Sequence, residues 1–456
     1  MLNLGLNFDD DRETRVAETA SAALERRIAA EIERRRDALV DLLARLIAFD
    51  TRAPGPDLVP RDEAALQGYL ADRLRAAGLT VDVWEPDVAA LPATGHQIPS
   101  GYHFRGRPQL VARAVGSGGG RSLLLNGHVD VVTPEPREEW TTDPFAGTVR
   151  DGRVYGRGAC DMKGGVAALV LATEILMELG VALRGDLVVN TVTDEESTAA
   201  GALAAVARGV SADGAIVPEP TALTVWLGTR GSLLPEITVA GRPGHAGFPH
   251  DHARDGGPVN AIEKMQVVLG ALRALREEWR DRSDPRHPWL RPGTIVPTGF
   301  DAGQWIVSYP AAATLRCHVQ YLPTQADSAG TGAPVVREIE ERVRAAAAAD
   351  PWLAAHPPSF VWHGDVPAAC VEPDTPVAAT TLDVMAAFGL GRAIDSRTTW
   401  FDGATFTRAG TPAIAFGPGA IARAHAVDEY VPIDELVRAA QVLAVTAVRF
   451  CGVDGR

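Results

Sequence analysis

The sequence contains few cysteines, only 4 in 456 residues. They lie far apart and none has CxxC spacing, so neither a disulfide framework nor a thiolate zinc site is predicted. The first residues, MLNLGLNFDDDRETR, have acids where a signal peptide needs a basic start and an apolar run. No segment approaches the ~20 apolar residues of a membrane span. These absences predict a cytoplasmic protein that does not contact a membrane.

Positive charge is also scarce. The chain has 44 Lys and Arg against 58 Asp and Glu, giving a formal net charge of −14. A chain this acidic, without a concentrated basic patch, is not expected to bind nucleic acid. Hydrophobic residues make up 46% and charged residues 22%, which is ordinary for a globular protein. A length of 456 residues predicts more than one domain.

The first half of the chain has the pattern of a layered α/β domain. Apolar residues at helical spacing predict a long helix, or two joined helices, over residues 13–48 and another helix over 61–77, followed by a strand over 79–86. The runs LVARAV, SLLLNGHVDVV, DLVVNTVT and GAIVPEP predict buried strands of a mostly parallel sheet. A helix is predicted over GGVAALVLATEILMEL, beginning just after Asp161.

From residue 223 the pattern changes to alternating strands and long helices in β-α-β-α order, which predicts a smaller α+β domain. Sequence compatible with the first domain resumes near residue 374. We therefore expect a catalytic domain in two parts, 1–222 and 369–456, with a domain of residues 223–368 inserted between them. Residues 1–32 are expected to form an N-terminal helical extension.

Five potential metal ligands are scattered along the chain, most of them at the carboxyl ends of predicted strands. Such ends converge at one edge of an α/β sheet. Two imidazoles, a carboxylate able to bridge and two further carboxylates are what a pair of divalent ions needs if each keeps a position for water. The five residues are His128 in LLLNGHVDVV, Asp161 in GRGACDMKGG, Glu196 in TVTDEES, Glu219 in IVPEPT and His425 in ARAHAVDEY.

Each segment has a simpler interpretation when taken alone. His128 and Asp130 share one face of a strand end, so Asp130 is predicted to fix the tautomer of a ligating His128, although an isolated HxD is more often a surface pair. Asp161 lies between glycine pairs, which suit close approach to an ion, a phosphate loop or a plain turn. The segment lacks the GxxxxGK[ST] order, which weakens the phosphate interpretation.

The acids of residues 194–196 follow an apolar strand, where their repulsion needs a cation or solvent to offset it. We predict that one carboxylate binds metal while its neighbour accepts a proton; the alternative is a solvated acidic loop. His245, in GRPGHAGFPHDH, lies in the inserted domain. It is predicted to donate a hydrogen bond to a developing oxyanion if domains or subunits close.

In combination, GHVDVV, GRGACDMKGG, TDEES, PEPT, GRPGHAGFPH and AHAVDEYVP occur in the order of one known family. From about Arg34 to Val453 the chain resembles the M20 metallopeptidases, which include acetylornithine deacetylases, succinyl-diaminopimelate desuccinylases, aminoacylases and carboxypeptidases.

The resemblance implies a set of roles. One Zn²⁺ would be held by His128, Asp161 and Glu219, and a second by Asp161, Glu196 and His425, with Co²⁺ or Mn²⁺ as alternative metals. Asp130 would orient His128, and Glu195 would be the general base. The inserted domain would act as a lid and form a homodimer, with His245 approaching the active site of its own or of the partner subunit. Arg230, in GTRGS, would contact substrate.

The function implied is a dizinc amidohydrolase that removes the acyl group of an N-acyl amino acid or related small amide. A dipeptidase, a carboxypeptidase or an N-carbamoyl hydrolase of the same family is the near alternative. A non-catalytic binding homologue and a nucleotide-binding protein are the more distant ones. Two segments depart from the family pattern: residues 401–404, FDGA, lack the arginine that often follows, and GQWIVSYP lacks an asparagine. No particular acyl group is therefore predicted.

Overall fold

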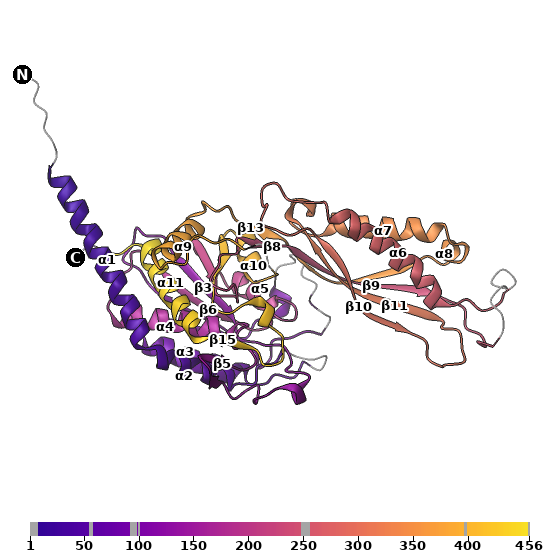
Figure 1. The fold of residues 1–456 in the computed structure, drawn as a ribbon, viewed down its shortest axis with the longest axis horizontal. Coiled ribbons are helices and arrows are strands. Elements are labelled where there is room, and N and C mark those ends of the chain that lie inside the picture. Colours follow the sequence, from indigo (N-terminus) through magenta and orange to yellow (C-terminus); the bar gives the residue numbers. More distant parts are fainter. Residues whose placement is uncertain are drawn as a thin grey trace, which may run out of the picture.

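The computed structural model describes residues 8–53, 58–91, 98, 101–247, 256–395 and 399–454, with the side chains of 8–20 excepted. The last three residues of the GRPGHAGFPH motif lie outside this part of the chain. The fold has two lobes, which lie side by side along the long axis of Figure 1. The large lobe is built on a six-stranded sheet and the small lobe on a four-stranded sheet.

The sheet of the large lobe has the strand order β1-β2-β6-β3-β7-β14. Strands β6, β3, β7 and β14 are parallel, whereas β2 is antiparallel to β6 and β1 is antiparallel to β2. The prediction of an α/β fold with a mostly parallel sheet is thus confirmed. The strands are β1 (Thr80–Trp84), β2 (Gln109–Ala114), β3 (Leu123–His128), β6 (Leu187–Val192), β7 (Gly214–Val217) and β14 (Ala413–Ala415).

Helices cover this sheet, and the predicted N-terminal helix is two helices that meet at Arg35. Helix α4 is buried along nearly its whole length, which explains why its sequence is apolar on every side. Helix α1 packs against α11 and extends beyond the lobe at its N-terminal end (Figure 1). The helices are α1 (Phe8–Arg34), α2 (Arg36–Ile47), α3 (Glu63–Ala76), α4 (Lys163–Glu178), α5 (Ala200–Ala207), α9 (Pro376–Ala387), α10 (Gly403–Arg408) and α11 (Ile433–Cys451).

The sheet of the small lobe is antiparallel, in the order β10-β11-β9-β12. Helices α6 and α7 cover one face, where alternate residues such as Leu233, Ile237 and Val239 are buried. The other face is partly exposed, as the alternating sequence predicts. The elements are β9 (Gly231–Ala240), α6 (Ala261–Trp279), β10 (Thr294–Ala302), β11 (Ala312–Tyr321), α7 (Ala333–Ala348), α8 (Pro351–Ala355) and β12 (Ser359–Val366).

The chain passes between the lobes twice, and the two passes pair with each other. Strand β8 (Gly228–Thr229) runs antiparallel to β13 (Ala369–Cys370). A separate three-stranded sheet, β15-β5-β4, flanks the large lobe. It consists of β4 (Thr148–Arg150), β5 (Arg153–Tyr155) and β15 (Tyr430–Pro432), and the 3₁₀ turns are η1 (Val88–Ala90), η2 (Arg137–Glu139), η4 (Pro323–Gln325) and η5 (Ile421–Arg423).

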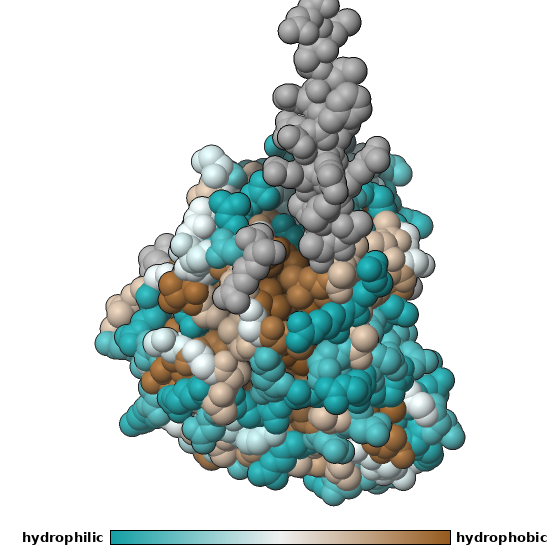
Figure 2. Space-filling view, turned by 90° about the vertical axis from the view of Figure 1, so that its left-hand side faces the viewer, coloured by the Kyte–Doolittle hydropathy of each residue, from teal (hydrophilic) through white to brown (hydrophobic). Residues whose placement is uncertain are grey.

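Figure 2 shows the end of the large lobe away from the small lobe. Most of the surface there is hydrophilic, and hydrophobic residues gather in a central hollow. Among the residues that the structure describes, none belongs to a helix with the length and apolarity that crossing a bilayer requires.

Candidate metal centre and active site

Three neighbouring parallel strands bring the predicted ligands to one edge of the large sheet. His128 is the last residue of β3, Glu195 and Glu196 follow the end of β6, and Glu219 follows the end of β7. Asp161 lies two residues before the start of α4, and His425 lies between η5 and β15. The sequence folds this way because each apolar run ends where the sheet edge meets solvent and loops begin.

Asp161 lies between the two imidazoles. His128 Nε2 is 3.2 Å from Asp161 Oδ1, and His425 Nε2 is 3.6 Å from Asp161 Oδ2. On the other side, His425 Nε2 is 3.1 Å from Glu196 Oε2. Each oxygen of Asp161 thus faces a different histidine, which is the arrangement that a bridging carboxylate needs.

Asp130 connects the end of β3 to the acidic loop after β6. Its carboxylate accepts hydrogen bonds from the backbone N–H groups of Glu195 and Glu196, at 3.2 and 3.1 Å. His128 Nδ1 lies 2.9 Å from the backbone carbonyl of Asp130 and 3.7 Å from its carboxylate. Because a carbonyl oxygen only accepts, Nδ1 carries the proton and Nε2 is left to bind a metal.

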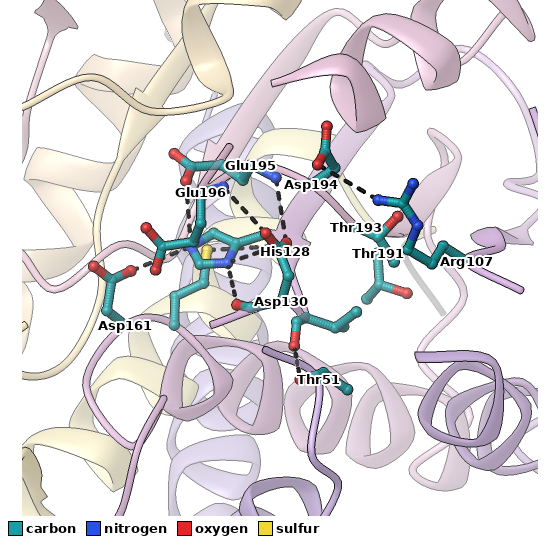
Figure 3. A network of polar contacts seen from close by, with 12 residues as sticks. Thr51, Arg107, His128, Asp130, Asp161, Thr191, Thr193, Asp194, Glu195 and Glu196 are labelled. Atoms are coloured by element: carbon teal, nitrogen blue, oxygen red, sulfur yellow. Dashed lines mark hydrogen bonds and ion pairs between the residues drawn. The ribbon is translucent and has the colours of Figure 1, made fainter. Parts of the chain in front are cut away.

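The three adjacent acids separate into two directions, as Figure 3 shows. Asp194 points toward Arg107, 3.7 Å away, and both side chains are buried. Glu195 and Glu196 turn toward His128 instead. The repulsion expected within this run is therefore partly relieved by an arginine, and the rest is concentrated at the histidines.

Repulsion among the buried carboxylates of the cluster favours the binding of cations. Burial raises the pKa of Glu195 well above its ordinary value, and the neighbouring charges of Glu219 and Glu196 raise it further. Burial and the charge of Asp161 raise the pKa of Glu219 in the same way. Burial alone would lower the pKa of His128, but the surrounding carboxylates raise it well above its usual value. A divalent ion would relieve this repulsion.

The donor set fits such ions. The ligand atoms of His128, Glu195 and Glu219 lie within 4.8 Å of one another, and so do those of His128, Asp161 and Glu196. Glu219 Oε1 is buried without a hydrogen-bond partner among the described residues, as expected of an atom that needs a ligand. Imidazole nitrogens and carboxylate oxygens are the ligands of Zn²⁺ and similar metals.

The described side chains of the cluster differ in their exposure to solvent. The His425 side chain is 53% exposed, whereas the side chain of His128 is 1% exposed and that of Glu196 7% exposed. Of these three side chains, that of His425 is the one accessible to a small molecule from solvent.

Two of the predicted site residues lie apart from this cluster. Arg230 stands between β8 and β9 at the junction of the lobes, where its guanidinium donates to the carbonyl of Pro292 at 3.0 Å. Burial and the charge of Arg291 lower the pKa of Arg230 to about 10. His245 follows β9 in the small lobe and forms a β-bridge with Ser308. Because β9 alone spans roughly 30 Å at ~3.3 Å per residue, His245 lies far from the junction.

Two buried carboxylates near the cluster were not singled out from the sequence. Asp402 is fully buried, neither of its oxygens has a hydrogen-bond partner in the described part of the chain, and burial raises its pKa to about 8. Glu429 is bonded to the segment that carries Asp161. Both stand in segments already quoted as motifs, FDGA and AHAVDEY, and that position was the available signal.

Comparison with known proteins decides the family. The model of peptidase family M20/M25/M40 matches residues 124–449, which include all five candidate ligands. The chain belongs to this family. The resemblance seen in the sequence is confirmed, and the protein is an M20 hydrolase that acts on amide bonds.

Relatives of this M20 protein include an N-formyl-4-amino-5-aminomethyl-2-methylpyrimidine deformylase of Halalkalibacterium halodurans. The two are 31% identical over 92% of this chain and 96% of the relative. A succinyl-diaminopimelate desuccinylase of Xanthomonas oryzae pv. oryzae is 38% identical over 62% of this chain and 68% of its own. A dinuclear metal-binding M20 peptidase of Bacillus subtilis shares the fold, with a TM-score of 0.62, 15% identity and coverage of 91% and 98%.

Proposed function

We propose that this M20 amidohydrolase is a dizinc deacylase that hydrolyses the amide of a small N-acyl amine or N-acyl amino acid. The observation that carries the proposal is the position of Glu195. Its carboxylate is buried and lies 3.9 Å from His128 Nε2, and its backbone N–H donates a hydrogen bond to the Asp130 carboxylate. A proton acceptor therefore lies inside the ligand cluster.

Each proposed ion has three ligands. His128, Asp161 and Glu219 would hold one Zn²⁺, and Asp161, Glu196 and His425 would hold the other, with Co²⁺ or Mn²⁺ as alternatives. When bound, such ions act as Lewis acids that polarise a carbonyl and lower the pKa of a water molecule. The nearly equal approach of both histidines to Asp161 supports the shared ligand.

The residues of this chain then divide the proton transfers. Glu195 accepts a proton from the attacking water and returns it to the departing amine as the C–N bond breaks. The products are a carboxylic acid and a free amine.

We propose that His245 supplies a hydrogen bond to the developing oxyanion and that Arg230 contacts the substrate. The distance between the end of β9 and the junction of the lobes favours delivery of His245 from a second subunit. A homodimer formed through the inserted domain would supply it. We place this domain at 223–368, between catalytic parts 1–222 and 369–456.

Among acyl groups, formyl on the amine of a small ring compound is the first to test. The deformylase relative matches nearly the whole of both chains, whereas the desuccinylase relative matches about two thirds of each. The missing arginine in FDGA also gives no support to a dicarboxylic acyl group. We further propose a cytoplasmic location, which suits four cysteines that are all thiols.

The test is a substrate panel on protein loaded with two equivalents of Zn²⁺, scored by amine release. It should contain N-formyl aminomethylpyrimidine, N-acetyl and N-succinyl amino acids, N-carbamoyl amino acids and dipeptides. We expect the highest kcat/KM on an N-formyl or N-acyl amine. Preference for dipeptides or carbamoyl compounds would overturn the deacylase proposal, and no hydrolysis of any member would overturn the function as a whole.

A further inference from the structure

Glu429 joins two parts of the ligand cluster that lie far apart in the sequence. It is fully buried, four residues after His425. Its Oε1 accepts hydrogen bonds from the backbone N–H groups of Cys160 at 2.8 Å and Asp161 at 3.0 Å. Its backbone carbonyl accepts another from the N–H of Gly156 at 2.9 Å. One residue therefore accepts three backbone hydrogen bonds from the segment 156–161 that leads into Asp161.

The second oxygen of Glu429 is also occupied. The guanidinium of Arg157, buried to the same degree, donates to Oε2. Arg157 also donates to the carbonyl of Thr133 at 3.2 Å and lies over the ring of Trp140, 5.2 Å from its centroid. These contacts fix the position of the Glu429 carboxylate, because both of its oxygens accept hydrogen bonds from buried donors.

His425 needs such an anchor. Its side chain is half exposed and contacts Asp161 and Glu196, both of them carboxylates that a metal would also bind. The backbone of His425 has φ of 61°, an unusual value for a residue other than glycine, so surrounding structure must hold it there.

We propose that Glu429 is a positioning residue that sets the spacing between Asp161 and His425, and so the affinity for the ion these two share. The inference rests on the proposed function, since it takes them as ligands of one ion. Glu429 itself touches neither substrate nor metal. The other ion, held by His128, Asp161 and Glu219, depends on Glu429 only through the backbone of Asp161.

The experiment compares Glu429→Ala, Glu429→Gln and a control, Glu435→Gln. Glu435 also accepts a backbone hydrogen bond, from Gly419 at 2.9 Å, but it does not join two ligands. Zinc bound per protein is measured over a range of buffered free Zn²⁺, and the visible spectrum is recorded as Co²⁺ is added stepwise. The melting temperature of each metal-free protein shows whether it folds.

We expect Glu429→Ala to weaken binding of the ion shared by Asp161 and His425 by roughly 10- to 100-fold. The affinity for the other ion should stay within about threefold of wild type. Glu429→Gln keeps one acceptor oxygen and should lose less affinity for that same ion. Glu435→Gln should leave the affinity for both ions unchanged. If Glu429→Ala does not fold, Glu429→Gln decides.

Binding of both ions as in wild type, or an equal loss of both, would overturn the positioning role. The proposed function fails separately and earlier, if the wild-type protein itself does not bind two ions.

Discussion

At the scale of single residues, Glu195 gives the sharpest prediction. Glu195→Gln keeps the size of the side chain and removes the proton acceptor. We expect kcat to fall by at least about 10²-fold, as for loss of a general base. Zinc content, measured by elemental analysis, should stay near two per chain, and the exposed Glu138→Gln should change neither quantity. Loss of zinc together with activity would make Glu195 a ligand instead, which its proximity to His128 and Glu219 makes a real alternative.

His318, on strand β11 of the small lobe, gives a prediction about pH. Burial and the charge of Arg230 lower its pKa below the ordinary 6.5. The unfolded chain therefore binds a proton more readily than the folded one, and stability is lost as pH falls below about 6.5. When pH is lowered from about 7.5 to about 5.5, the melting temperature of metal-free His318→Gln should fall less than that of metal-free wild type.

The partner of His318 supplies the control for this measurement. Ser232 Oγ lies 2.8 Å from His318 Nε2. Ser232→Ala removes the hydrogen bond but leaves the imidazole, so its pH dependence should persist. If the melting temperature falls equally with pH in wild type and in His318→Gln, protonation of His318 does not contribute to the pH dependence of stability.

At the scale of elements, helix α3 offers a matched pair of glycines. An added Cβ meets nothing within 4 Å at either Gly68 or Gly78, but Gly78 has φ of 94°. Gly78 ends the helix in a Schellman turn, in which Leu79 N–H donates to Leu74 O and Gly78 N–H to Arg75 O. Gly68→Ala should raise the free energy of unfolding by ~0.5–1 kcal/mol, and Gly78→Ala should lower it by about 1 kcal/mol or more. Denaturant titration of both variants measures this, and effects of the same sign would contradict the argument.

The elements also show where sequence patterns were informative. The buried strands β3, β6 and β7 were predictable because long apolar runs end abruptly at polar residues, and the same ends located the candidate ligands. Strands β10 and β12 were not predicted. Both are edge strands with irregular pairing, at Pro297 to Gly299 and at Trp362 to Asp365, so neither shows regular alternation. The role of Glu429 could not be read from the sequence either, because its partners lie about 270 residues away.

At the scale of the whole molecule, the ligand cluster should couple metal binding to the stability of the large lobe. Removal of metal leaves Asp161, Glu195, Glu196 and Glu219 buried together. Chelation with EDTA should lower the temperature at which the large lobe unfolds, since an ion present at 100 times its Kd contributes about 2.7 kcal/mol.

Calorimetry with and without Zn²⁺ measures this coupling. The small lobe has a core of its own and should respond less. Glu219→Gln reduces the repulsion and removes one ligand. The unfolding temperatures of the large lobe with and without Zn²⁺ should therefore differ less in this variant than in wild type. Identical scans of the wild-type protein with EDTA and with Zn²⁺ would contradict the coupling.

Glu429 and the Asp161 turn, which are hydrogen-bonded in the folded protein, are synthesised at different times. Ribosomes release a chain from its N-terminus, and early domains begin to fold before later ones exist. His128, Asp161, Glu196 and Glu219 all emerge before the small lobe, but His425 and Glu429 emerge after it. A nascent chain therefore carries an unfinished site throughout synthesis of the small lobe. If His425 is a metal ligand as proposed, we expect amide cleavage to begin only once the residues that return to the large lobe have left the ribosome.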